Sequence, residues 1–397
     1  HMVWYRVGAA DDPLGQSGIA HFLEHLMFKA TDELEPGEFS RVVAKNGGRD
    51  NAFTSYDYTS YYQNVARDRL ELVMRMEADR MADLRLTDEV VYPERSVVME
   101  ERRQRTENEP SDRFGEQFNA TRFVHHPYGT PVIGWMGEIA DLTRAEAEAF
   151  YRTWYAPNNA ILVVAGDRAA AELKPLAEKY YGAVAARAVP ERARVAEPPI
   201  GAARRVVLED TEVRMPVWRR AWLAPSYRVD PDGHAYALQV LTEIMSGGAT
   251  GRLYRTLVAE DKVATSAWMG YGPSSWDRTA LHMGGSPAPG VTMDRLESAL
   301  LEQVRRLLAD GVSAEEVATA KKRMLAEAAY ARDSLTGPAM ALGTALTTGQ
   351  SIDDVESWPV RIAAVTEEQV EAAARAVLGQ RNHVTGLLLP AQDKEGS

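Results

Sequence analysis

The pentapeptide His21-Phe22-Leu23-Glu24-His25 is the most informative stretch of this sequence. Its H-x-x-E-H spacing separates two histidines by four residues, so on a helix both imidazoles lie on one face, one turn apart. A zinc ion takes ligands in roughly tetrahedral directions, and such a pair supplies two of them. Glu24 lies on or beside the same face, where its carboxylate can reach a water on the metal. This order reverses the commoner H-E-x-x-H motif of zinc peptidases and predicts similar chemistry.

A third metal ligand is expected from the acidic run 93–103, which reads Pro-Glu-Arg-Ser-Val-Val-Met-Glu-Glu-Arg-Arg. The run suits a helix that begins near its proline. Glu94 and Glu101 are seven residues apart, so on a helix they point within about 20° of each other. Glu100 points well away from that stripe. The residues alone leave a non-metal interpretation of each motif open. The run 93–103 can be a solvated Glu/Arg face of a helix, and the pentapeptide can be a helix with two partly exposed histidines.

Composition limits the class of protein. A chain of 397 residues suits two domains of roughly 190 residues each, and 45% hydrophobic with 26% charged residues is typical of a globular protein. No apolar run is long enough to span a membrane. The net charge of −12 argues against a nucleic-acid partner and favours basic peptides. The absence of cysteine excludes disulfides and thiol catalysis.

An internal repeat organises the chain. Residues 139–146 are echoed by 362–369 at an offset of 223 (362 minus 139), and the same offset maps the apolar stretch 161–165 onto 384–388. Each copy predicts a threonine-capped helix, a loop with asparagine and a buried strand. Two copies of one α+β unit follow, joined through the proline-containing stretch 186–203, which lacks hydrophobic periodicity.

The segment Gly18–Lys29 resembles the zinc-site helix of the pitrilysin/insulysin family of inverzincins. The match is best to the bacterial short-chain branch related to the β-subunit of mitochondrial processing peptidase. In that family the third ligand is a glutamate in a stretch E-R-x-V-V-x-E-E. Glu101 falls in that place, 76 residues after His25 (101 minus 25), and Glu94 matches a glutamate that supports the site from behind the ligands.

The resemblance implies a fold of class α+β with two homologous domains, each a mostly antiparallel β-sheet covered by helices, facing each other across a crevice. The expected boundaries are 1–185 for an N-terminal zinc-binding catalytic domain, 186–205 for the linker and 206–397 for a C-terminal domain without zinc. The family usually has several tens of residues before the position of His1, including the first strands of the sheet. The compartment stays open, with the bacterial periplasm slightly favoured over the cytoplasm.

The stretch 47–62 opens with glycines and is rich in β-branched and aromatic residues, which predicts one strand with an irregular start. By resemblance it carries the family's N-A-x-T edge, along which an extended peptide adds as an extra strand. Asn51, Ala52 and Phe53 are therefore the candidate substrate contacts. A purely structural role for Phe53 is an equal alternative.

The second half departs from the family. A glycine-rich turn and an R-L-Y step are present at 246–254, but Val258 and Thr265 stand where the family usually has an arginine and a tyrosine that clamp the substrate. This gap suggests a dimer in which a related, zinc-free subunit supplies that pair. A homodimer or monomer is the alternative. His234, His282 and His383 are isolated and are expected to be structural, so one zinc per chain is predicted.

The combined prediction is a zinc-dependent endopeptidase that cleaves extended or unfolded peptides. His21, His25 and Glu101 hold the metal, Glu24 is the general base, and Glu94 orients a ligand or the base. The alternative from another class is a non-catalytic subunit of the same fold that only binds peptides.

Overall fold

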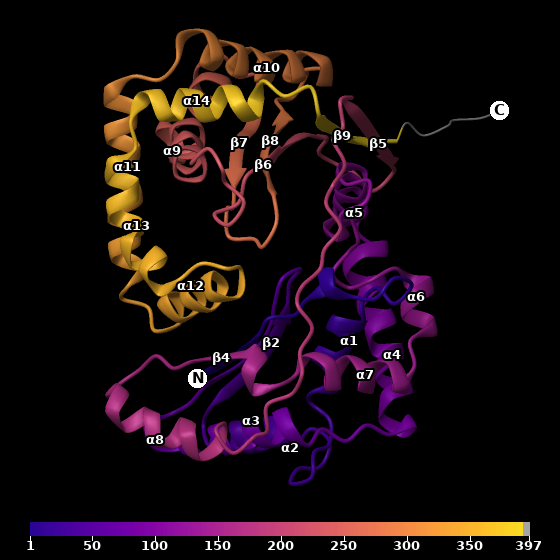
Figure 1. Cartoon of the computed structure of the whole chain (residues 1–397). Coiled ribbons are helices and arrows are strands. Elements are labelled where there is room, and N and C mark those ends of the chain that lie inside the picture. The colour runs from indigo at the N-terminus through magenta and orange to yellow at the C-terminus, as the bar shows by residue number, and fades with distance from the viewer. Residues whose placement is uncertain (392–397) are drawn as a thin grey trace, which may run out of the picture. The chain divides into compact units, whose positions relative to one another are not determined.

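Each half of the sequence contributes a β-sheet in the computed structural model, which describes residues 1–391 (Figure 1). The predicted α+β fold with two sheets and covering helices is confirmed. Contacts group the chain into two units, the first made of residues 1–105, 125–196 and 334–349 and the second of the remaining residues. The last six residues of the predicted domain 206–397 lie outside the described residues.

The sheet of the first unit is fully antiparallel, with strand order β2-β3-β1-β4. Its strands are β1 (Met2–Tyr5), β2 (Arg49–Thr54), β3 (Thr59–Asn64) and β4 (Ala160–Val163). Its helices are α1 (Ile19–Leu26), α2 (Glu38–Lys45), α3 (Leu70–Ala82), α4 (Asp88–Arg102), α6 (Met136–Asp141), α7 (Arg144–Trp154), α8 (Ala170–Tyr180) and α12 (Thr336–Thr347).

Alternation along β1 separates the two faces of this sheet. Val3 and Tyr5 belong to the core that includes residues of α1 and α7, whereas Met2 and Trp4 pack with Ala339 of α12. Both faces are therefore covered, and all four residues of β1 are buried. The zinc-site helix predicted from the sequence lies on the first of these faces.

The stretch 47–62 differs from its prediction. It forms two strands, β2 and β3, joined by a turn at residues 55–58 in which the Ser55 amide donates to the Tyr58 carbonyl. Asp57 fixes this turn, because its buried carboxylate accepts a hydrogen bond from Tyr128 at 2.7 Å and pairs with Arg194. The prediction of one continuous strand was wrong because this anchor comes from residues far along the chain.

The second unit contains a mixed sheet of order β5-β9-β6-β8-β7, in which only β5 and β9 run parallel. Its strands are β5 (Arg204–Asp210), β6 (Val217–Ala224), β7 (Ala264–Tyr271), β8 (Thr279–Pro287) and β9 (His383–Pro390). Its helices are α5 (Pro110–Arg122), α9 (Ala235–Ser246), α10 (Met293–Asp310), α11 (Ala314–Ala331), α13 (Ile352–Ala364) and α14 (Glu367–Leu378).

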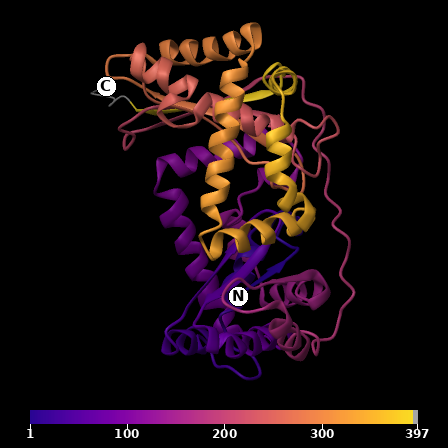
Figure 2. The same ribbon diagram turned by 90° about the vertical axis from the view of Figure 1, so that its left-hand side faces the viewer.

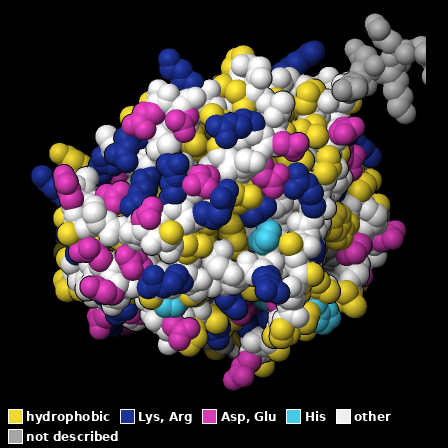
Figure 3. Space-filling view, turned by 90° about the horizontal axis from the view of Figure 1, so that it is seen from above, with side chains coloured by type: hydrophobic (Ala, Val, Ile, Leu, Met, Phe, Trp, Pro, Cys, Tyr) yellow, Lys and Arg dark blue, Asp and Glu magenta, His cyan; other side chains and the backbone are white. Residues whose placement is uncertain are grey.

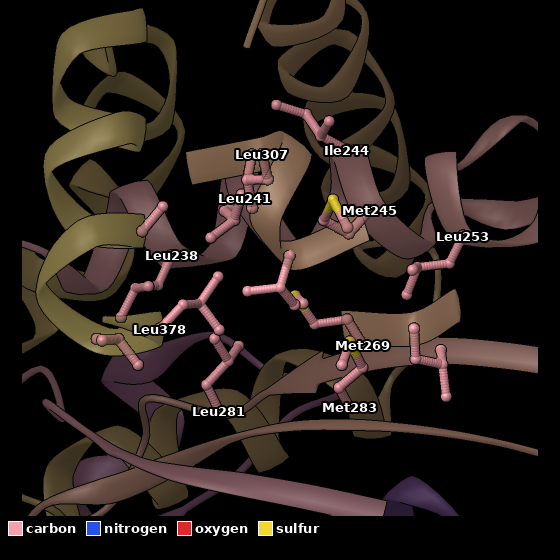
Figure 4. Packing of buried hydrophobic residues seen from close by; sticks show 14 of the residues in the cluster. Leu238, Leu241, Ile244, Met245, Leu253, Met269, Leu281, Met283, Leu307 and Leu378 are labelled. Atoms are coloured by element: carbon pink, nitrogen blue, oxygen red, sulfur yellow. The ribbon is translucent and has the colours of Figure 1, made fainter. Parts of the chain in front are cut away.

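The main core of this unit lies between the sheet and helices α9, α10 and α14. Figure 4 shows Leu238 and Leu241 of α9 packed with Leu281 and Met283 of β8. Helices α11 and α13 contact each other and run side by side in Figure 2. These apolar residues recur at helical and strand spacing, so their burial follows from the sequence pattern.

Two helices are exchanged between the halves of the sequence: each belongs to the unit that is formed mainly by the half from which the helix does not come. Helix α12, from the second half, packs in the first unit, where a Cβ on Gly343 would collide with the indole of Trp4. Helix α5, from the first half, packs in the second unit, where a Cβ on Gly386 of β9 would lie 2.6 Å from Phe114 Cζ. Glycine at each position permits the close approach of helix and sheet.

The predicted repeat is present in the structure. Thr143 caps α7 and Thr366 caps α14, each accepting from the amide three residues later in a capping box. A loop with asparagine then leads into β4 or β9. Between α8 and β5, residues 185–203 form neither helix nor strand.

Basic and acidic side chains are interspersed on the face of the molecule that Figure 3 shows. Within residues 1–391, no helix is both long and apolar enough to cross a membrane.

Candidate metal centre

Helix α1 carries the H-x-x-E-H motif, and its start is fixed by local geometry. Gly18 precedes the helix with a φ of 88°, and a Cβ there would collide with the carbonyl oxygen of Ile133. The Asp12 carboxylate accepts from the amides of Gly18 at 2.7 Å and Ala20 at 3.1 Å, and so binds amides at the helix N-terminus. The predicted helix is confirmed, and it is held rigidly at the end that precedes the histidines.

The structure brings His21, His25 and Glu101 together. Potential ligand atoms of these three residues all lie within 4.8 Å of one another, and no other such cluster of metal-binding side chains is found among the described residues. Oε2 of Glu101 lies 3.1 Å from Nε2 of His25 and 3.9 Å from Nε2 of His21. Two ring nitrogens and one carboxylate oxygen thus converge on one point.

Glu101 and Glu94 come from α4, which begins at Asp88, so Pro93 lies inside the helix and not at its start. Oε1 of Glu94 lies 2.9 Å from Nδ1 of His25, whereas Glu101 contacts Nε2 of the same ring. Lys29 donates to Oε2 of Glu94 at 2.5 Å. Glu100 instead accepts from Arg103 and Gln104 on the exposed side of the helix. The seven-residue spacing therefore puts Glu94 and Glu101 around one imidazole, as the helical stripe predicted.

The electrostatics of the centre follow from burial and from these contacts. Burial, with a contribution from neighbouring His25, lowers the pKa of His21 to about 4. Burial also disfavours the charged form of His25, but hydrogen bonds to Glu101 and Glu94 outweigh it and raise its pKa to about 9. The hydrogen bond from His25 holds the pKa of Glu101 below its usual value.

Glu24 lies on α1 between the two histidines in sequence and is buried. Its Oε2 accepts a hydrogen bond from the Thr54 hydroxyl at 2.6 Å. Burial raises the pKa of Glu24, and the Thr54 hydrogen bond opposes that rise. Thr54 was not among the residues predicted from the sequence. The available signal was the position of Thr54 two residues after Ala52, on the same face of a strand.

The candidate substrate contacts lie on β2, one of the two edge strands of its sheet among the described residues. Because Ser55 and Tyr58 form a hydrogen-bonded pair, alternation makes Ala52 and Thr54 members of non-bonded pairs, with N–H and C=O groups facing the free edge. The Ala52 amide donates to the Asn51 side-chain oxygen at 2.9 Å. Phe53 contacts Trp4 and Tyr58 on the opposite sheet face from α1. Their role in substrate binding stays a prediction.

Arg105 is a further residue at the centre that the sequence analysis missed. It belongs to the π-helical turn Arg103–Glu107 that follows α4, and its Nη1 lies 2.6 Å from Oε1 of Glu101. Three quarters of its side chain is exposed. The i, i+4 spacing from Glu101 was the available signal.

The second half has no comparable cluster among its described residues. Val258 lies in the π-helix Tyr254–Glu260 and packs against the core, and Thr265 lies on β7 beside a bulge. His282 contacts Arg122 at 3.0 Å, and His383 begins β9. Each of these two histidines lies near an arginine, and neither belongs to a metal-binding cluster within residues 1–391.

The donor set of the centre fits zinc. Two neutral imidazoles and one carboxylate form a ligand set that catalytic zinc sites use, with a position left for water or substrate. The second nitrogen of His25 already has a carboxylate partner, which is the usual support for a zinc-ligating histidine. A separate buried carboxylate, Glu24, lies beside the ligands and is not one of the three. The arrangement can therefore bind a cation and accept a proton at adjacent points.

Comparison with protein families gives two matches. Residues 2–135 match the model of insulinase, peptidase family M16, and residues 141–324 match the peptidase M16 inactive domain. The first match contains the whole H-x-x-E-H motif and Glu101. The second begins in the first half of the sequence and extends into the second half, in which no metal cluster is found among the described residues.

Individual relatives are named as zinc proteases, in agreement with the family match. The zinc protease PqqE of Helicobacter pylori is 33% identical over 312 residues, which cover 77% of this chain and 69% of the relative. An uncharacterized zinc protease of Mycobacterium leprae is 29% identical over 96% of this chain and 84% of its own length. The crystal structure of a protease from Helicobacter pylori superposes with a TM-score of 0.89 at 26% identity, covering 98% of this chain and 94% of that one.

Proposed function

Since the chain belongs to the insulinase family of peptidases, family M16, we propose that it is a zinc-dependent endopeptidase that cleaves extended or unfolded peptides. The observation that carries this proposal is the convergence of His21, His25 and Glu101 within 4.8 Å beside the buried carboxylate of Glu24. Glu24 is close enough to His25 and Glu101 to interact with them electrostatically. A metal site and a nearby proton acceptor are the two parts that metal-assisted hydrolysis needs. One zinc per chain is expected.

In this mechanism His21, His25 and Glu101 would hold the ion, and Glu94 fixes the ring of His25 through Nδ1. When bound, zinc would polarise the scissile carbonyl and lower the pKa of the attacking water. Glu24 takes the proton of that water on the carboxylate oxygen that Thr54 does not hold, and delivers it to the leaving nitrogen. The water oxygen first bonds to the carbonyl carbon, and the C–N bond then breaks as the leaving nitrogen takes the proton from Glu24.

The substrate would add along the free edge of β2. The outward N–H and C=O groups of Ala52 and Thr54 can pair with any extended backbone, which suits unfolded segments of varied sequence. On peptide binding, the hydrogen bond from the Ala52 amide to the Asn51 side chain would break. The Ala52 amide and the Asn51 side chain would then both be available to the peptide. Phe53 would support the strand from the opposite face of the sheet.

Cleavage of a mixture of unstructured peptides, detected by mass spectrometry, tests the proposal. The full chain loaded with zinc should give internal cleavage products, lose them after chelation, and regain them when zinc is restored. Peptide binding without cleavage by the zinc-loaded chain would instead support a non-catalytic, peptide-binding subunit.

A dimer with a zinc-free paralogous subunit is proposed because Val258 and Thr265 offer no guanidinium or phenol to a substrate. Such a partner would supply the arginine and tyrosine. Addition of a zinc-free paralogue from the same genome should raise the cleavage rate of the zinc-bearing chain. An unchanged rate, with a stable homodimer or monomer in solution, would contradict this part of the proposal and leave the zinc chemistry intact.

A further inference from the structure

We propose that Thr54 is the positioning residue of the general base, and that it also sets the register between the bound peptide and that base. The inference rests on the proposed function, since Glu24 is the proposed base. It assigns to Thr54 two contacts: its hydroxyl holds Glu24, and its backbone faces the free edge along which the peptide adds.

The hydroxyl contact is the main evidence. Thr54 Oγ1 donates to Oε2 of Glu24 at 2.6 Å, and within residues 1–391 it is the one hydrogen-bond donor recorded for that carboxylate. The Glu24 residue is only 9% exposed. A buried carboxylate with a single donor takes its orientation from that donor, because an ionised group left without hydrogen bonds is costly. Holding Oε2 leaves Oε1 as the proton acceptor.

The hydroxyl is itself held in place. Thr54 ends β2 and lies directly opposite Thr59, whose Oγ1 is 3.5 Å away. Thr59 is fully buried and donates to the Val7 carbonyl at 3.1 Å. Threonine is stiff at χ1, and the following turn is anchored through Asp57. The donor thus belongs to a rigid strand end.

The backbone contact follows from the strand register. Thr54 is in a non-hydrogen-bonded pair with Thr59, so its N–H and C=O point away from β3 toward the free edge. A peptide that pairs with these groups is therefore fixed relative to the same residue that orients Glu24. The backbone contact governs peptide binding, and the hydroxyl contact governs proton transfer.

This division predicts how substitutions behave. Thr54→Val removes the hydroxyl but keeps the shape and the backbone, so kcat should fall about 10- to 100-fold, the loss expected for a hydrogen bond to a charged group, while KM stays near the original value. Thr54→Ser keeps the hydroxyl and should recover most of the rate. Zinc affinity, measured by chelator competition, should be unchanged in both variants, since the side-chain partners of Thr54 within residues 1–391 are Glu24 and Thr59 and neither is a proposed ligand.

Ser60→Ala is the matched control. Ser60 lies on β3, is fully buried, and its Oγ has no hydrogen-bond partner among the described residues. Its loss removes a hydroxyl from the same sheet without touching Glu24, so kcat, KM and zinc affinity should all stay the same.

Crystal structures of the zinc-loaded Thr54→Val and Thr54→Ser variants give a second readout that does not need activity. The Glu24 carboxylate should turn or become disordered in Thr54→Val and keep its place in Thr54→Ser. A Glu24 carboxylate that keeps its place in Thr54→Val overturns the inference, as does an unchanged kcat in an active enzyme. Absence of cleavage by the original chain would contradict the proposed function, and the structures would still decide the role of Thr54.

Discussion

Nδ1 of His25 lies 2.9 Å from Oε1 of Glu94, while Nε2 of the same ring lies 3.1 Å from Oε2 of Glu101. One imidazole is thus held between two carboxylates from a single helix. Glu101 contacts Nε2, the nitrogen that a metal ion would also bind. Glu94 contacts Nδ1 on the opposite side of the ring and so fixes the orientation of the imidazole. The two glutamates therefore have different expected effects on metal binding.

Glu94→Gln should lower zinc affinity about 10- to 100-fold, because the ring of His25 loses the charged partner that orients it. Chelator competition followed by mass spectrometry of the metal content measures this. Glu100→Gln is the matched control on the exposed side of the same helix and should leave affinity unchanged. Equal affinity in Glu94→Gln and the original chain would exclude this role.

Arg194 ties the linker to the first unit through buried ion pairs. Its guanidinium contacts Asp11 at 3.1 Å and also pairs with Asp57, and all three side chains are almost fully buried. Arg194→Met leaves two buried carboxylates short of a partner and should cost about 3–5 kcal/mol of unfolding free energy. Denaturant titration measures the loss.

Arg67→Met is the control for this change, because its pair with Asp167 is exposed. A surface pair contributes about 0–1 kcal/mol. If Arg194→Met is no more destabilising than Arg67→Met, the linker is not anchored by this cluster.

His282 should make the second unit sensitive to acid. Burial, with the nearby charges of Arg122 and Arg219, lowers its pKa to about 3 from an ordinary value of 6.5. Above pH 6.5 both folded and unfolded chains carry it neutral. As the pH falls from 6.5 toward 3, only the unfolded chain takes up the proton, so this residue reduces the unfolding free energy by at most about 1.4 kcal/mol per pH unit.

His282→Gln keeps a polar group next to Arg122 and removes this titration. Unfolding free energies measured between pH 7 and pH 4 should therefore fall less steeply in the variant than in the original chain. Parallel pH profiles for the two proteins would show that His282 is protonated alike in both states.

Much of the fold was predictable because its signals are local or periodic. The helix of the H-x-x-E-H motif, the helix that carries Glu94 and Glu101, and the two threonine-capped helices of the repeat all follow from spacing within a few turns. The same spacing places five of the proposed site residues on two helices. Capping boxes and helical stripes need no knowledge of the tertiary structure.

The remaining features depend on contacts between distant residues. The turn at 55–58 is fixed by Tyr128 and Arg194, and Thr54 reaches a carboxylate thirty residues away in sequence. The grouping of α5 and α12 depends on which sheet each helix packs against. That packing requires glycine at 386 on the sheet that α5 contacts and at 343 on α12 itself. No local pattern in the sequence carries that information.

The most direct test of the zinc peptidase assignment compares zinc content and peptide cleavage in Glu24→Gln and Glu101→Gln. Glu24→Gln should bind one zinc per chain and lose cleavage by about 100- to 10,000-fold, because the ion stays while the proton acceptor is lost. Glu101→Gln should lose the metal and the cleavage together. Cleavage that persists in zinc-loaded Glu24→Gln, or full zinc content in Glu101→Gln, would contradict the account.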